Sequence, residues 1–136
     1  MSDEPVGSEA SAPGCSILLV EDNPINQKVV KLMLGRFRII PAIASSGIEA
    51  IGMVENQTFD LILMDLHMPG MDGVEAVSKI RELLGEQCPP IVALTADSVF
   101  NLDGDMRQNG FNGFLTKPVN ADTFRKCILE HTGKAY

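Results

Sequence analysis

The sequence is poor in basic residues, and this scarcity argues against two classes of partner. Its 136 residues include 11 Lys and Arg against 18 Asp and Glu, which gives a formal net charge of -7. Nucleic acids and anionic membranes attract positive surfaces, so this balance argues against either as a partner. An acidic surface can also serve solubility alone. The charge therefore excludes partners without identifying a function.

Long apolar segments are also missing. No apolar run approaches the roughly 20 residues that a transmembrane helix needs. Residues 1–14 lack the basic and apolar regions of a signal peptide, and they are rich in Ser, Pro, Gly and acidic residues. We therefore expect a cytoplasmic protein in which residues 1–14 form a flexible tail or linker and residues 15–136 form one domain.

Cysteine and histidine are too scarce for the usual disulfide and zinc arrangements. The cysteines, Cys15, Cys88 and Cys127, are odd in number and show no C-x-x-C spacing, so we expect free thiols. The histidines are His67 and His131, and two such residues give little support to a histidine metal site.

What the sequence does contain is a regular alternation of short apolar runs with segments of helical period. The expected strands are residues 17–20, about 39–43, 61–64, 91–94 and 113–116. The expected helices are residues 24–35, 47–56, 73–84 and 121–131, and a further short or mobile helix over 97–109 would be the fourth of five along the chain. This alternation predicts an α/β fold, a flavodoxin-like doubly wound five-stranded parallel sheet of order 2-1-3-4-5 with five helices. Pro41 supports an edge position for the second strand, because a proline lacks the N–H that a central strand would use.

The first helix has clear boundary signals. Asn23 can cap it, Pro24 suits its first turn and Gly35 can end it. Four apolar residues would share one face of this helix: Ile25, Val29, Leu32 and Met33. In the other helices, the residues expected to face inward are Ile51, Val54, Val74, Val77, Ile80, Leu84, Phe124, Cys127 and Ile128, and Asn120 would cap the last helix.

Polar residues follow the strands at the edge where an open α/β sheet binds its ligands, beyond the carboxyl ends. Glu21 and Asp22 follow the first strand and Asp65 follows the third. Thr95 and Lys117 follow the fourth and the fifth. The topology therefore predicts that three carboxylates, a hydroxyl and an ammonium group meet at one rim.

Crowded carboxylates repel one another, and a hard divalent cation would relieve the repulsion. Mg²⁺ prefers oxygen ligands and commonly combines one or two carboxylates with a phosphate oxygen. Glu21, Asp22 and Asp65 are therefore a candidate Mg²⁺ site, although a single acidic residue at a strand end is more often a loop cap. Lys117 and Thr95 would add contacts to the oxygens of a phosphoryl group on Asp65, which favours phosphoryl transfer over simple binding.

Four segments carry a family resemblance: ILLVEDNPINQ, DLILMDLHMPGMDG, ALTA and GFLTKP. From Cys15 to the C-terminus they resemble, in order and spacing, the response-regulator receiver (CheY-like) family, and the VEDNPIN form is most like the receiver of a hybrid sensor histidine kinase. The resemblance implies that Asp65 accepts the phosphoryl group. It also implies that Asp22 binds the metal directly and that Glu21 binds it through water.

The resemblance assigns further roles. The backbone carbonyl of His67 would complete the protein's share of the metal ligands, and the side chains of His67 and Asp97 would tune autodephosphorylation. Thr95 would move toward the phosphoryl group and let Phe114 turn inward, which would change the face formed by the fourth helix, the fifth strand and the fifth helix. On pattern alone, Phe114 could equally be a core residue of an apolar strand.

The implied function is acceptance of a phosphoryl group from a phosphohistidine, with Mg²⁺ or Mn²⁺ as cofactor and a histidine kinase or histidine-containing phosphotransfer domain as partner. Slow self-catalysed hydrolysis would make the protein a timed switch rather than a turnover enzyme. It would be cytoplasmic, alone or as the cytoplasmic part of a membrane-anchored hybrid kinase. Two alternatives stay open: a degenerate receiver that acts only as an interaction module, and an aspartate-nucleophile phosphohydrolase. Against the latter, His67 stands where such enzymes carry a second Asp.

Overall fold

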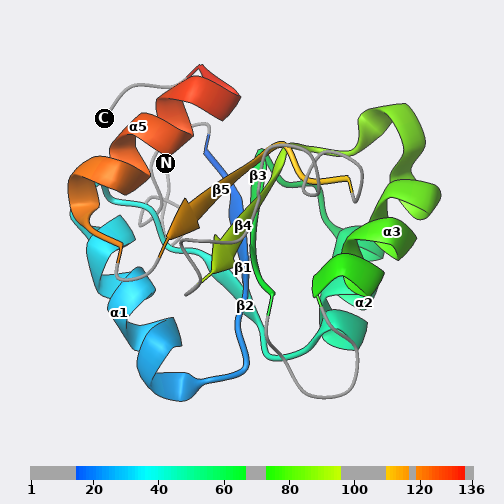
Figure 1. Cartoon of the computed structure of the whole chain (residues 1–136), viewed down its shortest axis with the longest axis horizontal. Coiled ribbons are helices and arrows are strands. Elements are labelled where there is room, and N and C mark those ends of the chain that lie inside the picture. The colour runs from blue at the N-terminus through cyan, green and yellow to red at the C-terminus, as the bar shows by residue number, and fades with distance from the viewer. Residues whose placement is uncertain (1–14, 67–72, 96–109, 117–118, 134–136) are drawn as a thin grey trace, which may run out of the picture.

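The structure is a computed structural model that describes residues 15–66, 73–95, 110–116 and 119–133 (Figure 1). The expected tail over 1–14 and the expected helix over 97–109 lie outside these ranges. The strands are β1 (Ile17–Val20), β2 (Ala42–Ala44), β3 (Leu61–Asp65), β4 (Ile91–Thr95) and β5 (Gly113–Thr116). The helices are α1 (Pro24–Gly35), α2 (Gly47–Asn56), α3 (Gly73–Leu84), the 3-10 helix η2 (Gly85–Gln87) and α5 (Ala121–Thr132).

The strands form one parallel sheet in the order β2-β1-β3-β4-β5, which confirms the predicted flavodoxin-like topology. Helices α1 and α5 cover one face of the sheet, and α2 and α3 cover the other (Figure 1). All strands run in the same direction, so their carboxyl ends meet at one edge.

Strand β2 lies at an edge of the sheet, as Pro41 predicts, but it begins later than expected. The chain makes a turn after α1, in which the Ile39 N–H donates to the carbonyl of Leu34 at 3.1 Å. Residues 39–41 connect this turn to β2, and Pro41 precedes the strand instead of lying inside it.

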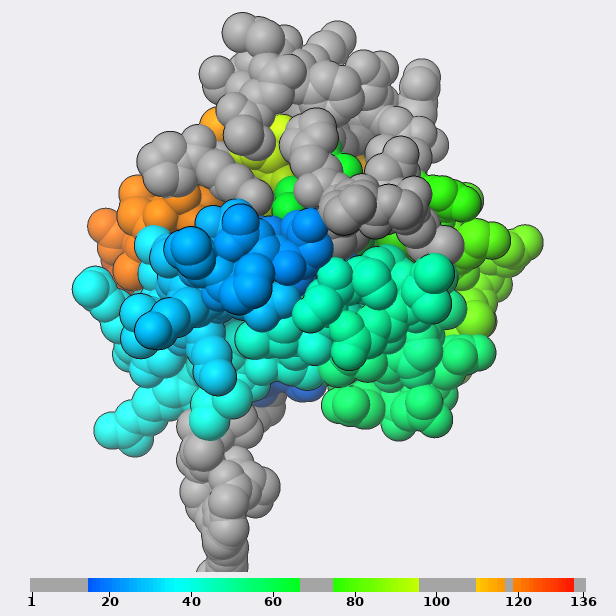
Figure 2. Space-filling view, turned by 90° about the horizontal axis from the view of Figure 1, so that it is seen from below, coloured from blue at the N-terminus to red at the C-terminus, as the bar shows by residue number. Residues whose placement is uncertain are grey.

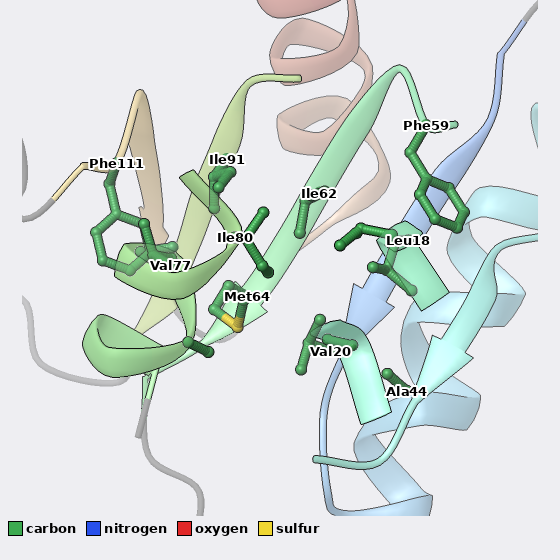
Figure 3. Packing of buried hydrophobic residues seen from close by; sticks show 14 residues of the cluster. Leu18, Val20, Ala44, Phe59, Ile62, Met64, Val77, Ile80, Ile91 and Phe111 are labelled. Atoms are coloured by element: carbon green, nitrogen blue, oxygen red, sulfur yellow. The ribbon is translucent and has the colours of Figure 1, made fainter. Parts of the chain in front are cut away.

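Two apolar layers enclose the sheet, because successive residues of a strand point to opposite faces. Toward α2 and α3, the strands contribute Leu18, Val20, Ala44, Ile62, Met64, Ile91 and Ala93 (Figure 3). Toward α1 and α5, they contribute Ile17, Leu19, Leu61, Leu63, Val92 and Leu94. Full burial of one such aliphatic side chain contributes about 1.5–3 kcal/mol to folding. Both layers end where the polar rim begins.

The predicted inward residues of the later helices are largely confirmed. Val54, Val77, Ile80, Phe124, Cys127 and Ile128 are buried, while Ile51 and Leu84 are partly buried against the core. The side chain of Val74 lies outside the described residues. The predicted caps are also present: the Asn23 side chain accepts hydrogen bonds from the N–H groups of Ile25 and Asn26, and that of Asn120 accepts one from Thr123.

The apolar residues predicted to share one face of α1 are mostly not the residues that the helix buries. The residues that α1 buries are Val30 and Leu34, and Met33 is half-buried beside them. By contrast, Ile25 and Leu32 are 72% and 66% exposed, and Val29 is 41% exposed. Ile25, Val29 and Leu32 lie three or four positions apart, so they form an apolar stripe on the outer side of the helix.

The cysteines are reduced thiols, as expected from their spacing. Burial raises the pKa of the Cys127 thiol to about 12, with a smaller contribution from Glu130. Burial also raises the pKa of Cys88, against the opposing effect of Arg81. Neither side chain is therefore a thiolate at neutral pH.

None of the described helices has the length and apolarity that a membrane span requires.

Candidate functional site

The strand register brings the predicted acidic residues together. Val20 pairs with Met64, so Glu21 and Asp65 follow at the same level on neighbouring strands. Asp65 in turn pairs with Leu94, which places Thr95 one position beyond it on β4. Thr95 pairs with Thr116, the last residue of β5. The site is therefore a consequence of parallel pairing among four strands.

The carboxylates of Glu21, Asp22 and Asp65 converge, with one oxygen of each lying within 4.8 Å of the others. Glu21 is only 1% exposed and Asp65 3%, whereas Asp22 is half-buried. Two oxygens bound to the same Mg²⁺ are separated by about 4.2 Å at most, since each bond is near 2.1 Å. The cluster thus fits Mg²⁺ after a small closure, or with one ligand acting through a water.

The loop that carries Glu21 and Asp22 is fixed by hydrogen bonds. The N–H of Glu21 donates to the Ala44 carbonyl at 3.0 Å, and its Oε2 accepts from the Asn23 N–H at 3.3 Å. The Glu21 carbonyl accepts from the Gln27 side-chain amide at 2.5 Å. Sequence reasoning found Asn23 as a helix cap but missed Gln27, because its contact depends on how α1 packs beside the loop.

Thr95 and Phe114 occupy different environments. Thr95 is 1% exposed at the end of β4, close to the acidic cluster in register. Phe114 is 40% exposed, so the alternative that it is a core residue of β5 is wrong. It lines a groove of about 730 Å³ between β5 and α5, together with Leu115, Lys126 and His131.

The model of the response regulator receiver domain family matches residues 17–129, which span the sheet and the acidic cluster. The chain belongs to the response regulator receiver family. Three further predicted residues of this receiver, His67, Asp97 and Lys117, lie outside the described residues.

Curated relatives include hybrid-type sensor kinases. The receiver is 35% identical over 133 residues to the sensor protein GacS of Pseudomonas syringae pv. syringae, and that alignment covers 96% of the chain and 15% of GacS. It is 30% identical over 124 residues to the kinase BarA of Escherichia coli K12, covering 91% of the chain and 14% of BarA. The receiver thus spans about a seventh of the length of these relatives.

Of two similar solved structures, one contains a bound metal ion and the other a bound partner protein. The receiver domain of sensor histidine kinase PA1611 from Pseudomonas aeruginosa PAO1, with a magnesium ion coordinated in its active-site cleft, has a TM-score of 0.80 and 36% identity over 89% of this chain and 99% of that one. The receiver domain of Ssk1, in complex with the histidine phosphotransfer protein Ypd1 of Saccharomyces cerevisiae, has a TM-score of 0.81 and 33% identity over 89% of this chain and 90% of that one.

Proposed function

We propose that this receiver accepts a phosphoryl group from a phosphohistidine onto Asp65 in a Mg²⁺-dependent reaction. The observation that carries the proposal is the convergence of the Glu21, Asp22 and Asp65 carboxylates within 4.8 Å, two of them almost fully buried. Three carboxylates at this spacing repel one another, and a bound cation would relieve the repulsion. The magnesium ion in the similar receiver of PA1611 supports the same use of the site in this chain.

The chemistry follows from the position of Asp65 at the rim. One carboxylate oxygen of Asp65 attacks the phosphorus in line, the bond from phosphorus to the imidazole nitrogen breaks, and an acyl phosphate forms on Asp65. Asp22 and Asp65 would hold the metal directly, Glu21 would hold it through water, and the His67 carbonyl would add a ligand. Bound Mg²⁺, or Mn²⁺ in its place, supplies charge neutralisation for the nucleophile and the phosphoryl oxygens.

Side chains of β4 and of the segment after β5 would contact the transferred group. The Thr95 hydroxyl and the Lys117 ammonium each donate to one phosphoryl oxygen in this proposal. Water then hydrolyses the acyl phosphate slowly, at a rate tuned by His67 and Asp97. Each phosphorylation of Asp65 is followed by one slow hydrolysis that restores the free carboxylate. In this proposal the receiver therefore acts as a switch and not as a turnover enzyme.

The readout of the switch is proposed for the surface next to Phe114. Movement of Thr95 toward the phosphoryl group frees space into which Phe114 turns, and this changes the face built from the fourth helix, β5 and α5. The 40% exposure of Phe114 supports this role, because the ring would bury more apolar surface if it turned inward. The groove between β5 and α5 lies beside the same ring.

The proposed phosphodonor is a histidine kinase or a histidine-containing phosphotransfer domain. The apolar stripe of Ile25, Val29 and Leu32 begins three residues after Asp22, at the rim that carries Asp65. A contiguous row of large exposed apolar side chains is typical of a protein-binding surface. The complex of the similar Ssk1 receiver with Ypd1 supports a partner of this kind.

Labelling of Asp65 tests the function. Purified protein is incubated with acetyl phosphate or with a radiolabelled phosphohistidine donor and Mg²⁺, and Asp65→Asn is compared with Asp122→Asn, whose carboxylate is exposed on α5. We expect Asp122→Asn to label normally and Asp65→Asn to remain unlabelled. Equal labelling of the two variants would contradict the assignment.

Two other outcomes identify the alternatives. A degenerate interaction module would show no Mg²⁺-dependent NMR shift changes around Asp65 on addition of beryllofluoride, a phosphoryl mimic. A phosphohydrolase would release phosphate from small phosphomonoesters over many turnovers. Both measurements use the unsubstituted protein.

A further inference from the structure

Gln27, on the first turns of α1, connects two loops at the rim of the sheet. Its side-chain amide donates a hydrogen bond to the Glu21 carbonyl at 2.5 Å and another to the Ser45 hydroxyl at 3.2 Å. Glu21 precedes α1 and Ser45 precedes α2. The beginning of α1 (blue) and α2 (blue-green) adjoin on the face seen in Figure 2, which is the arrangement that lets one amide reach both loops.

The first of these bonds fixes the backbone of a proposed metal ligand. On one side, the Glu21 N–H is held by the Ala44 carbonyl of β2 at 3.0 Å. On the other side, the Glu21 carbonyl is held by Gln27. The peptide groups that flank the Glu21 side chain are thus anchored from two directions, which limits how far its carboxylate can retreat from Asp65.

The second bond anchors Gln27 itself. Ser45 is held in place by α2, since its N–H donates to Glu49 Oε1 at 2.6 Å. Glu49 is fixed in turn by its own N–H, which donates to the Ser46 hydroxyl at 3.1 Å in the cap of α2. A continuous set of hydrogen bonds therefore runs from the first turn of α2, through Ser45 and Gln27, to Glu21.

We propose that Gln27 is a positioning residue of the Mg²⁺ site, and this inference rests on the proposed function. Without metal, Glu21, Asp22 and Asp65 repel one another, and the loop after β1 can relieve the repulsion by moving outward. The Gln27 amide opposes that movement and keeps the carboxylates close enough to share one cation. Residues that hold metal ligands in this indirect way raise metal affinity by reducing the reorganisation that binding requires.

The variant that tests this role is Gln27→Met, because methionine keeps the length of the side chain and removes the donor. Lys28→Met is the matched control, since Lys28 is the next residue of α1 and is exposed. Ser45→Ala removes the anchor of Gln27 and leaves the bond to Glu21. Three quantities are measured: the Mg²⁺ dissociation constant by calorimetry, amide hydrogen exchange in metal-free protein, and the acetyl phosphate labelling rate as a function of Mg²⁺ concentration.

We expect Gln27→Met to weaken Mg²⁺ binding about 10-fold, which is the lower end of the usual effect of removing a residue that supports a metal ligand. The labelling rate at saturating Mg²⁺ should stay within about twofold, because the ligands and Asp65 are unchanged. Exchange of the Glu21 N–H should accelerate in metal-free Gln27→Met and not in Lys28→Met. Ser45→Ala should weaken binding by less, and combining it with Gln27→Met should add little, because both act through one amide.

Several outcomes would overturn the inference. One is a Gln27→Met protein that loses thermal stability but keeps its Mg²⁺ affinity, because that is the behaviour of a merely structural residue. A second is a Lys28→Met variant whose Mg²⁺ affinity falls as much as that of Gln27→Met. A third is an unsubstituted chain that does not bind Mg²⁺. A chain that binds Mg²⁺ but is never labelled contradicts the proposed phosphoryl transfer alone, and the dissociation constants still decide the role of Gln27.

Discussion

The two ends of the sheet both carry polar residues, but the residues are arranged in opposite ways. At the carboxyl ends of the strands, Glu21, Asp22 and Asp65 bring like charges within 4.8 Å. At the amino ends, donors face acceptors: the Ser16 N–H donates to Asp60 Oδ2 at 2.8 Å, and the Asp60 N–H donates to the Ser16 carbonyl at 2.7 Å. The hydrogen bonds at the amino end link the starts of β1 and β3, whereas the like charges at the carboxyl end are crowded in a way that a cation would relieve.

A second group at the amino end shows the same complementarity. Asn112 Oδ1 accepts hydrogen bonds from the Ile91 N–H at 2.9 Å and from the Arg81 guanidinium. Arg81 Nε also donates to the Gly110 carbonyl at 2.7 Å. These contacts join α3 to the starts of β4 and β5. This difference predicts that substitutions at the carboxyl end of the sheet reduce phosphoryl acceptance, whereas substitutions at the amino end reduce the stability of the fold.

The largest expected effect is the loss of phosphoryl acceptance in Asp65→Asn. The amide has the shape of the carboxylate but is a poor nucleophile, so labelling by acetyl phosphate should fall by at least about 1,000-fold. The free energy of unfolding, measured by urea denaturation, should change by no more than about 1 kcal/mol, because the shape is kept and repulsion with Glu21 is removed. A large loss of stability without loss of labelling would reverse the comparison between the ends.

The sequence was sufficient to predict the acidic cluster, because its geometry follows from topology. Once the alternation of strands and helices indicates a parallel sheet, Glu21 and Asp65 must lie at the same edge. The structure confirms that their strands are neighbours and that their positions align in register. This step needs no side-chain detail, because the order and direction of the strands decide it.

The outer face of α1 could not be predicted in the same way. The helix is apolar around much of its circumference. Helical spacing alone therefore allows either of two sets to face the core: the stripe of Ile25, Val29 and Leu32, or the pair Val30 and Leu34. The structure selects the pair. Gln27 was missed for a related reason, since Ser45 is separated from it by 18 positions along the chain and only packing brings them together.

Substitution of Asn112 tests the amino end. Asn112→Ala removes the acceptor for the buried Ile91 and for Arg81, and we expect the free energy of unfolding to fall by about 2 kcal/mol. Labelling of Asp65 at a temperature where the variant is folded should be unchanged. Asn112→Asp is the control, because it keeps an oxygen acceptor facing the Arg81 guanidinium and should retain most of the stability. Equal losses in the two variants would show that the hydrogen bonds are not the cause.

Stabilisation by added Mg²⁺ should depend on residues at the carboxyl end of the sheet and not on residues at the amino end. At 10 times its dissociation constant, the ion should stabilise the unsubstituted protein by about 1.4 kcal/mol, because it binds the folded state preferentially. Asp22→Asn should lose most of this increment. Asp60→Asn, at the other end, should be less stable in absolute terms but keep the increment. Thermal unfolding with and without Mg²⁺ measures each value, and loss of the increment in Asp60→Asn would indicate that Mg²⁺ acts on overall charge.

The smallest expected effect concerns the end of α1, on the amino side of the sheet, where one residue is strained. Arg38 has a φ of 63°, in the left-handed region that favours glycine. This conformation lets the Arg38 N–H donate to the Gly35 carbonyl at 3.0 Å and the Ile39 N–H donate to Leu34 at 3.1 Å, the pattern that ends many helices.

Arg38→Gly should therefore stabilise the protein by about 0.5 to 1 kcal/mol, since relief of strain exceeds the added entropy of the unfolded chain. Arg36→Gly is the matched control, because Arg36 has an ordinary helical φ of -63° and should lose about as much stability as Arg38→Gly gains. Urea denaturation measures both. If both glycines destabilise equally, the left-handed geometry at Arg38 has no appreciable energetic cost, and the amino end of the domain is free of stored strain as well as of charge repulsion.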